Sequence, residues 1–138
     1  MKHVTSAQVH RNRLKRMARI KDASIKALWD AGEVVRADAQ ASIRAGAVSG
    51  PAHVPSAPYT PPNANTHNLD LSIDVRINPS RKSVSVFARA PYAAALEFGH
   101  STLIERPFLR PALRRNRNRI VYGQVQAVRE VVRVLKGS

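Results

Sequence analysis

The stretch Ile73-Asp-Val-Arg-Ile-Asn-Pro-Ser-Arg-Lys-Ser-Val-Ser-Val-Phe-Ala88 decides the fold of this 138-residue chain. Apolar side chains occupy every second position of residues 73–77 and again of residues 84–88, which is the period of a strand with one buried face. Asn78-Pro79-Ser80 between the two runs is typical of a turn. The stretch therefore predicts a β-hairpin with one face on a hydrophobic core.

A long helix is predicted before the hairpin, over residues 5–45. Thr5, followed three residues later by Gln8, has the pattern of a capping box at a helix start. Apolar residues then recur at steps of three and four, as on one buried helix face: Leu14, Met17, Ile25, Leu28, Val35, Ala39 and Ile43. Gly32 lies on this stripe at a cost of about 1 kcal/mol relative to alanine. It therefore marks either a kink or a close approach by another segment.

A second long helix is predicted after the hairpin, beginning near Pro107 and Pro111 and ending at about residue 135. Pro91 and Gly99 bracket a short helix before it, Tyr92–Phe98. The apolar stripe of the second long helix is Val121, Val125, Val128, Val132 and Leu135, broadened by Ile120 and Val131. The expected fold class is α+β: a long N-terminal helix, a small antiparallel β-hairpin, a short helix and a long C-terminal helix.

Composition divides this single domain, residues 1–138, into three segments. Residues 1–22 are rich in Lys and Arg and are expected to form a helical arm, called the basic arm below. Residues 46–66 hold five prolines and form a long loop, which in a small domain usually serves a function. Residues 67–138 carry the hairpin and the C-terminal helix. Tyr59 in the loop is either a turn residue or, as we favour, an anchor at an interface.

The charge of the chain is its most unusual property. The 23 Lys and Arg residues against nine Asp and Glu give a net charge of +14 and a pI near 11.5. Such a field attracts a phosphate polymer or an acidic protein surface; the alternative is a solvated surface inside an assembly. The residues expected to face DNA or an acidic partner are Arg13, Lys15 and Arg16 in the basic arm, with Arg114, Arg115, Arg117 and Arg119 in the C-terminal helix. An arginine strip of this kind binds phosphates without reading bases.

No pattern in the sequence favours catalysis, a metal or a cofactor. Cysteine is absent, and the five histidines show no metal-binding spacing. Glu97 and His100 are close enough in sequence to touch, but a catalytic pair would still need a nucleophile and an oxyanion site. A structural Glu97, capping or bridging near Gly99, is the favoured interpretation. The chain is therefore expected not to be an enzyme.

Membrane insertion and secretion are not expected either. No run of about 18 apolar residues is present. The N-terminus is basic but has no apolar segment or cleavage site of a secretory signal. The chain is expected to remain in the cytoplasm in which it is made.

Two motifs near the C-terminal helix carry a family resemblance. They are Tyr92-Ala-Ala-Ala-Leu-Glu-Phe-Gly99 and Arg106-Pro-Phe-Leu-Arg-Pro-Ala-Leu113. They resemble the Tyr-Ala…Glu-Phe-Gly-Thr and Pro-Phe-x-Arg-Pro-Ala motifs of the tail-completion, or head–tail joining (neck), proteins of long-tailed bacteriophages. This is a minor tail-component family, and the order of elements matches it from about residue 20 to residue 135. The stretch Thr66–Ile73 is similar to the family's entry into the hairpin, with His67 in place of the usual glycine. His100 stands where threonine is common, so the turn geometry at these two positions is in question.

The resemblance implies a structural virion protein at the head–tail junction, assembled in the host cytoplasm. Such a subunit would form a homo-oligomeric ring, six-fold by family analogy, around double-stranded DNA in the neck channel. Its protein partners would be head-closure or adaptor proteins and tail-terminator or tail-tube proteins. The motif residues Tyr92, Glu97, Phe98, Gly99, Pro107, Phe108 and Pro111 would be structural: the two phenylalanines would pack onto the sheet, the prolines would fix the turn, and Glu97 would pair with Arg106 or Arg110. The rival hypothesis is a free basic protein that binds nucleic acid without sequence preference.

Overall fold

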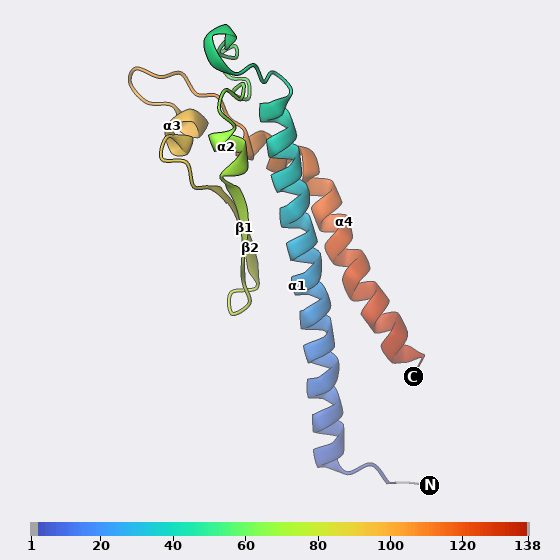
Figure 1. Ribbon diagram of the computed structural model, residues 1–138. Helices are drawn as coiled ribbons and strands as arrows, with labels where there is room; N and C mark the ends of the chain where they lie inside the picture. The colour runs from blue at the N-terminus through green and yellow to red at the C-terminus, as the bar shows by residue number, and fades with distance from the viewer. Residues whose placement is uncertain (1–2, 138) are drawn as a thin grey trace.

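The computed structural model describes residues 3–137, so Met1 and Lys2 of the predicted basic arm lie outside the described residues. Three long elements set its shape (Figure 1). Helix α1 (Ser6–Arg44) runs between a hairpin on one side and helix α4 (Leu109–Lys136) on the other, and α4 is antiparallel to α1. The N-terminal end of α1 extends past the C-terminal end of α4.

The predicted helix start is confirmed at the N-terminus of α1. Thr5 is the N-cap, and its hydroxyl accepts a hydrogen bond from the Gln8 backbone N–H at 3.2 Å. The helix then continues unbroken to Arg44. Its residues 6–19 are exposed, and burial begins only where other elements reach α1.

The hairpin pairs β1 (Ile73–Asn78) with β2 (Ser83–Ala88) in a two-stranded antiparallel sheet. Val75 lies opposite Val86, so the apolar residues of both strands share the face that packs on α1. The turn is longer than three residues because Lys82 also takes part, with a φ of +51°. The predicted hairpin and its buried face are thus confirmed.

Gly32 marks the close approach of the hairpin to α1 rather than a kink. A Cβ atom at this position would lie 2.7 Å from Val84 Cγ1 and 2.8 Å from Val75 Cγ1. The absent side chain therefore lets the inner face of the hairpin rest directly on the α1 backbone.

Short elements close the domain over the hydrophobic core. They are the 3-10 turn η1 (Gly50–Ala52) in the proline-rich loop, α2 (Asn68–Leu71) before the hairpin and α3 (Ala93–Phe98) after it. The buried core consists of Val35, Ala39, Ile43, Ala64, Leu69, Ile73, Ala93, Phe108 and Ala112. All of it lies toward the C-terminal end of α1, so the basic arm has no share in it.

The predicted apolar stripe of α4 is wrong at its first two members. Val121 and Val125 are exposed, whereas Ala112 and Ile120 pack toward the core. Polar contacts orient the helix instead: Asn116 Nδ2 donates to Asp38 of α1 at 2.7 Å, and Ser24 of α1 donates to Gln124 Oε1 at 3.0 Å. Polar side chains thus take part in the α1 contact, and Val121 and Val125 remain on the outer face.

Candidate functional site

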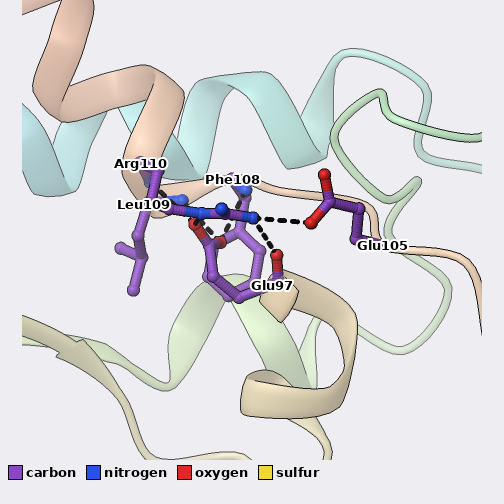
Figure 2. A network of polar contacts seen from close by, with 5 residues as sticks. All are labelled: Glu97, Glu105, Phe108, Leu109 and Arg110. Atoms are coloured by element: carbon purple, nitrogen blue, oxygen red, sulfur yellow. Dashed lines mark hydrogen bonds and ion pairs between the residues drawn. The ribbon is translucent and has the colours of Figure 1, made fainter. Parts of the chain in front are cut away.

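Glu97 is the most densely bonded side chain of the domain (Figure 2). It lies near the end of α3 and is only 4% exposed. One carboxylate oxygen accepts the backbone N–H groups of Phe108 at 2.8 Å and Leu109 at 3.0 Å, and the other accepts that of Arg110 at 2.9 Å. Because Phe108 is the N-cap of α4 and has no side-chain cap bond of its own, Glu97 caps α4 from a different element.

Arg110 completes this junction. Its Nε donates to Glu97 at 3.0 Å, and its Nη2 donates to Glu105 at 2.9 Å. The guanidinium also lies 4.9 Å from the centre of the Phe98 ring. The predicted partner of Glu97 is therefore confirmed as Arg110, while Arg106 Nε donates to the Ser56 carbonyl in the proline-rich loop.

The motif implied that Phe98 and Phe108 both pack on the sheet, but only Phe108 is buried. Phe108 is fully buried in the core, but Phe98 is 65% exposed and does not pack on the sheet. Because Glu97 must point inward to reach the α4 backbone, the next side chain in this short helix is directed outward. Phe98 instead lies beneath the Arg110 guanidinium.

Gly99 and the two prolines set the path between α3 and α4. Gly99 ends α3 with a φ of +69°, and a Cβ there would lie 2.8 Å from the Leu103 carbonyl oxygen. Pro107 is buried just before the Phe108 cap, and Pro111 lies in the first turn of α4, where no intrahelical N–H is required. His100 pairs in a β-bridge with Leu103, so no Glu97–His100 contact is made.

The electrostatics of the junction favour an ionised Glu97. Burial is the largest single influence and raises the pKa of Glu97. The hydrogen bonds from the backbones of Phe108, Leu109 and Arg110 and from the Arg110 side chain outweigh it, so the pKa lies below its usual value. A carboxylate at this helix N-terminus also opposes the positive charge of the arginines in the first turns of α4.

A second buried carboxylate, Asp70 of α2, joins α2 to α1. It accepts hydrogen bonds from Arg44 Nε at 2.6 Å and from His67 Nδ1 at 3.2 Å. His67 adopts a φ of +61°, a left-handed conformation natural to the glycine common in the resembling family. Sequence reasoning missed Asp70 because a lone Asp in a short turn gives no periodic signal.

Low carboxylate pKa values predict acid sensitivity. For Asp70, burial raises the pKa, but the bonds from Arg44 and His67 lower it below its usual value; for Asp38, the Arg115 bond is the main cause of a lowered pKa. Since Glu97 is shifted the same way, the unfolded chain binds more protons than the folded chain near pH 4. The stabilisation that these three carboxylates contribute is therefore fully present above about pH 5. It is lost as the pH falls through their pKa values in the folded chain. Urea midpoints measured from pH 7 to pH 3 should fall only in the acidic range, and an unchanged midpoint would contradict this.

The arginines of α4 fall into two groups. Arg115 is used within the chain, since its Nη2 and Nε lie 2.9 and 3.1 Å from the Asp38 carboxylate. Arg114, Arg117 and Arg119 are exposed and have no ion pair in the described residues. Arg13, Lys15 and Arg16 of the basic arm are exposed in the same way. Tyr59, also exposed, has a φ of +62° in the loop, and Tyr92 is the partly exposed N-cap of α3.

Most acidic side chains of the described residues already form ion pairs within the chain. Of the nine acidic residues, all of which fall within the described part, only Asp22 and Asp30 lack an ion pair with Arg or His. A second copy of the chain can therefore neutralise little of the net charge of +14.

Within residues 3–137 no group of His, Asp and Glu side chains is arranged to hold a metal ion. No helix among these residues is both long and apolar enough to span a bilayer.

Comparison with known proteins gives one match. The model of the HK97-gp10-like family of bacteriophage tail components matches residues 8–99, from the first turns of α1 through the end of α3. Searches of curated proteins and of solved structures give no match. The family is one of structural tail components and not of enzymes. Because the match covers most of the chain and all but one of its elements, this chain belongs to the HK97-gp10-like family and is a structural component of a bacteriophage tail.

Proposed function

We propose that this tail component is a tail-completion or head–tail connector subunit, and that copies of it form a ring around the DNA channel at the phage neck. The ring is six-fold by analogy with the resembling neck proteins. Its axial neighbours are head-closure or adaptor proteins on one side and tail-terminator or tail-tube proteins on the other. Tyr59, an exposed residue of the proline-rich loop, serves as an anchor in one of these interfaces.

The observation that carries this proposal is the uncompensated positive charge. The chain has a net charge of +14, and only Asp22 and Asp30 remain free to pair with a neighbouring copy. Copies that assemble side by side therefore accumulate repulsion unless a polyanion lies between them. Duplex DNA, with one phosphate per ~1.7 Å of axis, supplies that counter-charge in a channel.

Exposed apolar side chains support assembly. Val9, Met17 and Tyr122 are large, exposed and carried by the two long helices. A free monomer with such surfaces on projecting helices would be prone to associate. The basic residues that we assign to DNA or to an acidic partner surface are Arg114, Arg117 and Arg119 of α4 together with Arg13, Lys15 and Arg16 of the basic arm.

The test is DNA binding as a function of salt by a chain whose oligomeric state is measured by mass photometry and cryo-electron microscopy. We expect rings, and a strongly negative slope of log K against log salt. Changing Arg114, Arg117 and Arg119 together to Gln should make the slope less negative by about 0.9 for each phosphate that the protein no longer neutralises. Arg115→Gln is the matched control, because this side chain is held by Asp38, and it should leave the slope unchanged.

Two results would contradict the proposal. Tight, salt-sensitive binding by a chain that stays monomeric or dimeric, alone and with tail proteins, would favour the free nucleic-acid-binding protein. Rings that bind DNA no better than a neutral protein does would remove DNA as the source of the counter-charge.

A further inference from the structure

A groove of about 530 Å³ lies between α1 and α4 where the two helices do not close on each other. Its walls combine small and larger side chains. The small ones are Ala23, Ala27 and Ala31 on α1 and Gly123 and Ala127 on α4, and the larger apolar ones are Val34, Ile120, Tyr122 and Val131. Figure 1 shows α4 on the side of α1 that faces away from the hairpin. The groove is therefore an opening between two well-formed helices and is no part of the core.

Gly123 leaves open space on the α4 side of the groove. A glycine inside a helix costs about 1 kcal/mol relative to alanine. At Gly32 that cost has a reason, since Val75 and Val84 occupy the space of the missing side chain, but a Cβ at Gly123 would meet nothing within 4 Å. Nothing described in this chain needs a glycine there, so the close approach that it permits is by another molecule.

The basic arm has a face that fits this groove. Val9, Met17 and Ile20 share one face of the arm with the polar side chains of Asn12, Arg13 and Arg16, and these three apolar residues are called the apolar ridge below. The apolar ridge Val9–Ile20 and the groove wall Ala23–Val34 each extend over eleven residue steps, or about 16 Å of helix. Ridge and groove therefore match in length and in apolar character.

The occupant cannot be the chain's own arm. The arm and the α1 wall of the groove belong to one unbroken helix, Ser6–Arg44, so the arm cannot fold back onto it. An arm that enters the groove must come from a second copy.

One free carboxylate at the rim can pair with a basic occupant. Asp30 lines the groove and is one of the two acids without an ion pair. Glu130 also lies at the rim, although Arg133 holds it, while Lys26 and Arg119 add two positive charges. Arg13 and Arg16 flank the apolar ridge, so one of them can pair with the free Asp30 carboxylate as the ridge enters.

We propose that the groove between α1 and α4 receives the basic arm of a second copy of this chain, head to tail. Each copy then donates its arm to one neighbour and receives the arm of the other, a heterologous contact that closes into a ring when the rotation allows. This inference rests on the proposed ring and supplies its subunit contact. Lys15 and the other basic residues on the far side of the arm stay free for DNA.

The test uses two variants that leave the monomer fold intact. Gly123→Leu fills the groove from a position with open space, and Met17→Asp places a charge on the ridge at a residue that is 56% exposed. Each should raise the dissociation constant of the oligomer by at least about tenfold in sedimentation velocity. The matched controls are Gly123→Ala, which stabilises α4 without filling the groove, and Ala18→Asp, an exposed position of the arm that points away from the Val9, Met17 and Ile20 side chains.

Mixing the two variants gives the decisive result. The Gly123→Leu chain keeps a functional arm and the Met17→Asp chain keeps an open groove, so an equimolar mixture should form a one-to-one dimer that neither forms alone. Circular dichroism confirms folding of every variant.

Three other outcomes would distinguish failure of the arm-in-groove contact from failure of the ring. Wild-type rings that persist in both variants would overturn the arm-in-groove contact and leave the ring function standing. A wild-type dimer that both variants dissolve would support the contact and overturn the ring. A wild-type chain that stays monomeric at high concentration and with DNA would overturn both.

Discussion

Replacing Glu97 with alanine is expected to lower the free energy of unfolding by about 3–5 kcal/mol, because three backbone N–H groups lose their acceptor at about 1–3 kcal/mol for each one left buried. The change removes the acceptor of three backbone N–H groups at the start of α4 and leaves the Arg110 guanidinium without its buried partner. Each N–H left buried and unpaired adds a desolvation penalty. Urea unfolding followed by circular dichroism at pH 7 measures the effect.

Glu130→Ala is the control for this substitution. Glu130 also pairs with an arginine, at 2.6 Å from Arg133, but the pair is exposed and only three residues apart on α4. Its loss should leave the urea midpoint close to that of the unchanged chain, because solvent screens an exposed pair. If Glu97→Ala does not fold, Glu97→Gln, which keeps the shape and one acceptor oxygen, should fold with an intermediate loss. Equal effects of Glu97→Ala and Glu130→Ala would show that the cap does not hold α4 in place.

Patterns that repeat along the chain can be predicted from the sequence, whereas the contacts that Glu97 makes across a loop cannot. Periodicity predicted the hairpin and both long helices, because each is a local pattern that repeats along the chain. At Gly32 the sequence left a kink and a close approach open, and only the fold decides between them. Glu97 and Phe108 were recognised as motif residues, but capping across a loop joins residues 11 apart and leaves no periodic signal. The partner Arg110 was one of two candidates, and only the fold decides between it and Arg106.

The orientation of α4 shows the limit of hydrophobic pattern more clearly. The valines that form its strongest stripe include Val121 and Val125 on the outer face. The face of α4 that turns toward α1 carries Asn116 and Gln124, which are hydrogen-bonded to polar side chains of α1. A single sequence cannot distinguish an apolar face that packs within the subunit from one that is left for a partner, because both have the same period. In a tail component that works in an assembly, this ambiguity is expected, and it directs attention to the outer faces of α1 and α4.

Phe108→Ala should destabilise the chain by about 3–5 kcal/mol, whereas Phe98→Ala should cost less than about 1 kcal/mol. The two residues have the same chemistry and lie ten positions apart in the two motifs, but Phe108 is fully buried and Phe98 is 65% exposed. Truncation of Phe108 leaves a cavity in the core beside Ala112, and truncation of Phe98 removes only the ring beneath Arg110. Urea unfolding of both variants, at the pH used for Glu97, gives the comparison. A loss of similar size in both would mean that Phe98 also packs in the core, as the motif first implied, and would contradict the outward position that the inward turn of Glu97 imposes on it.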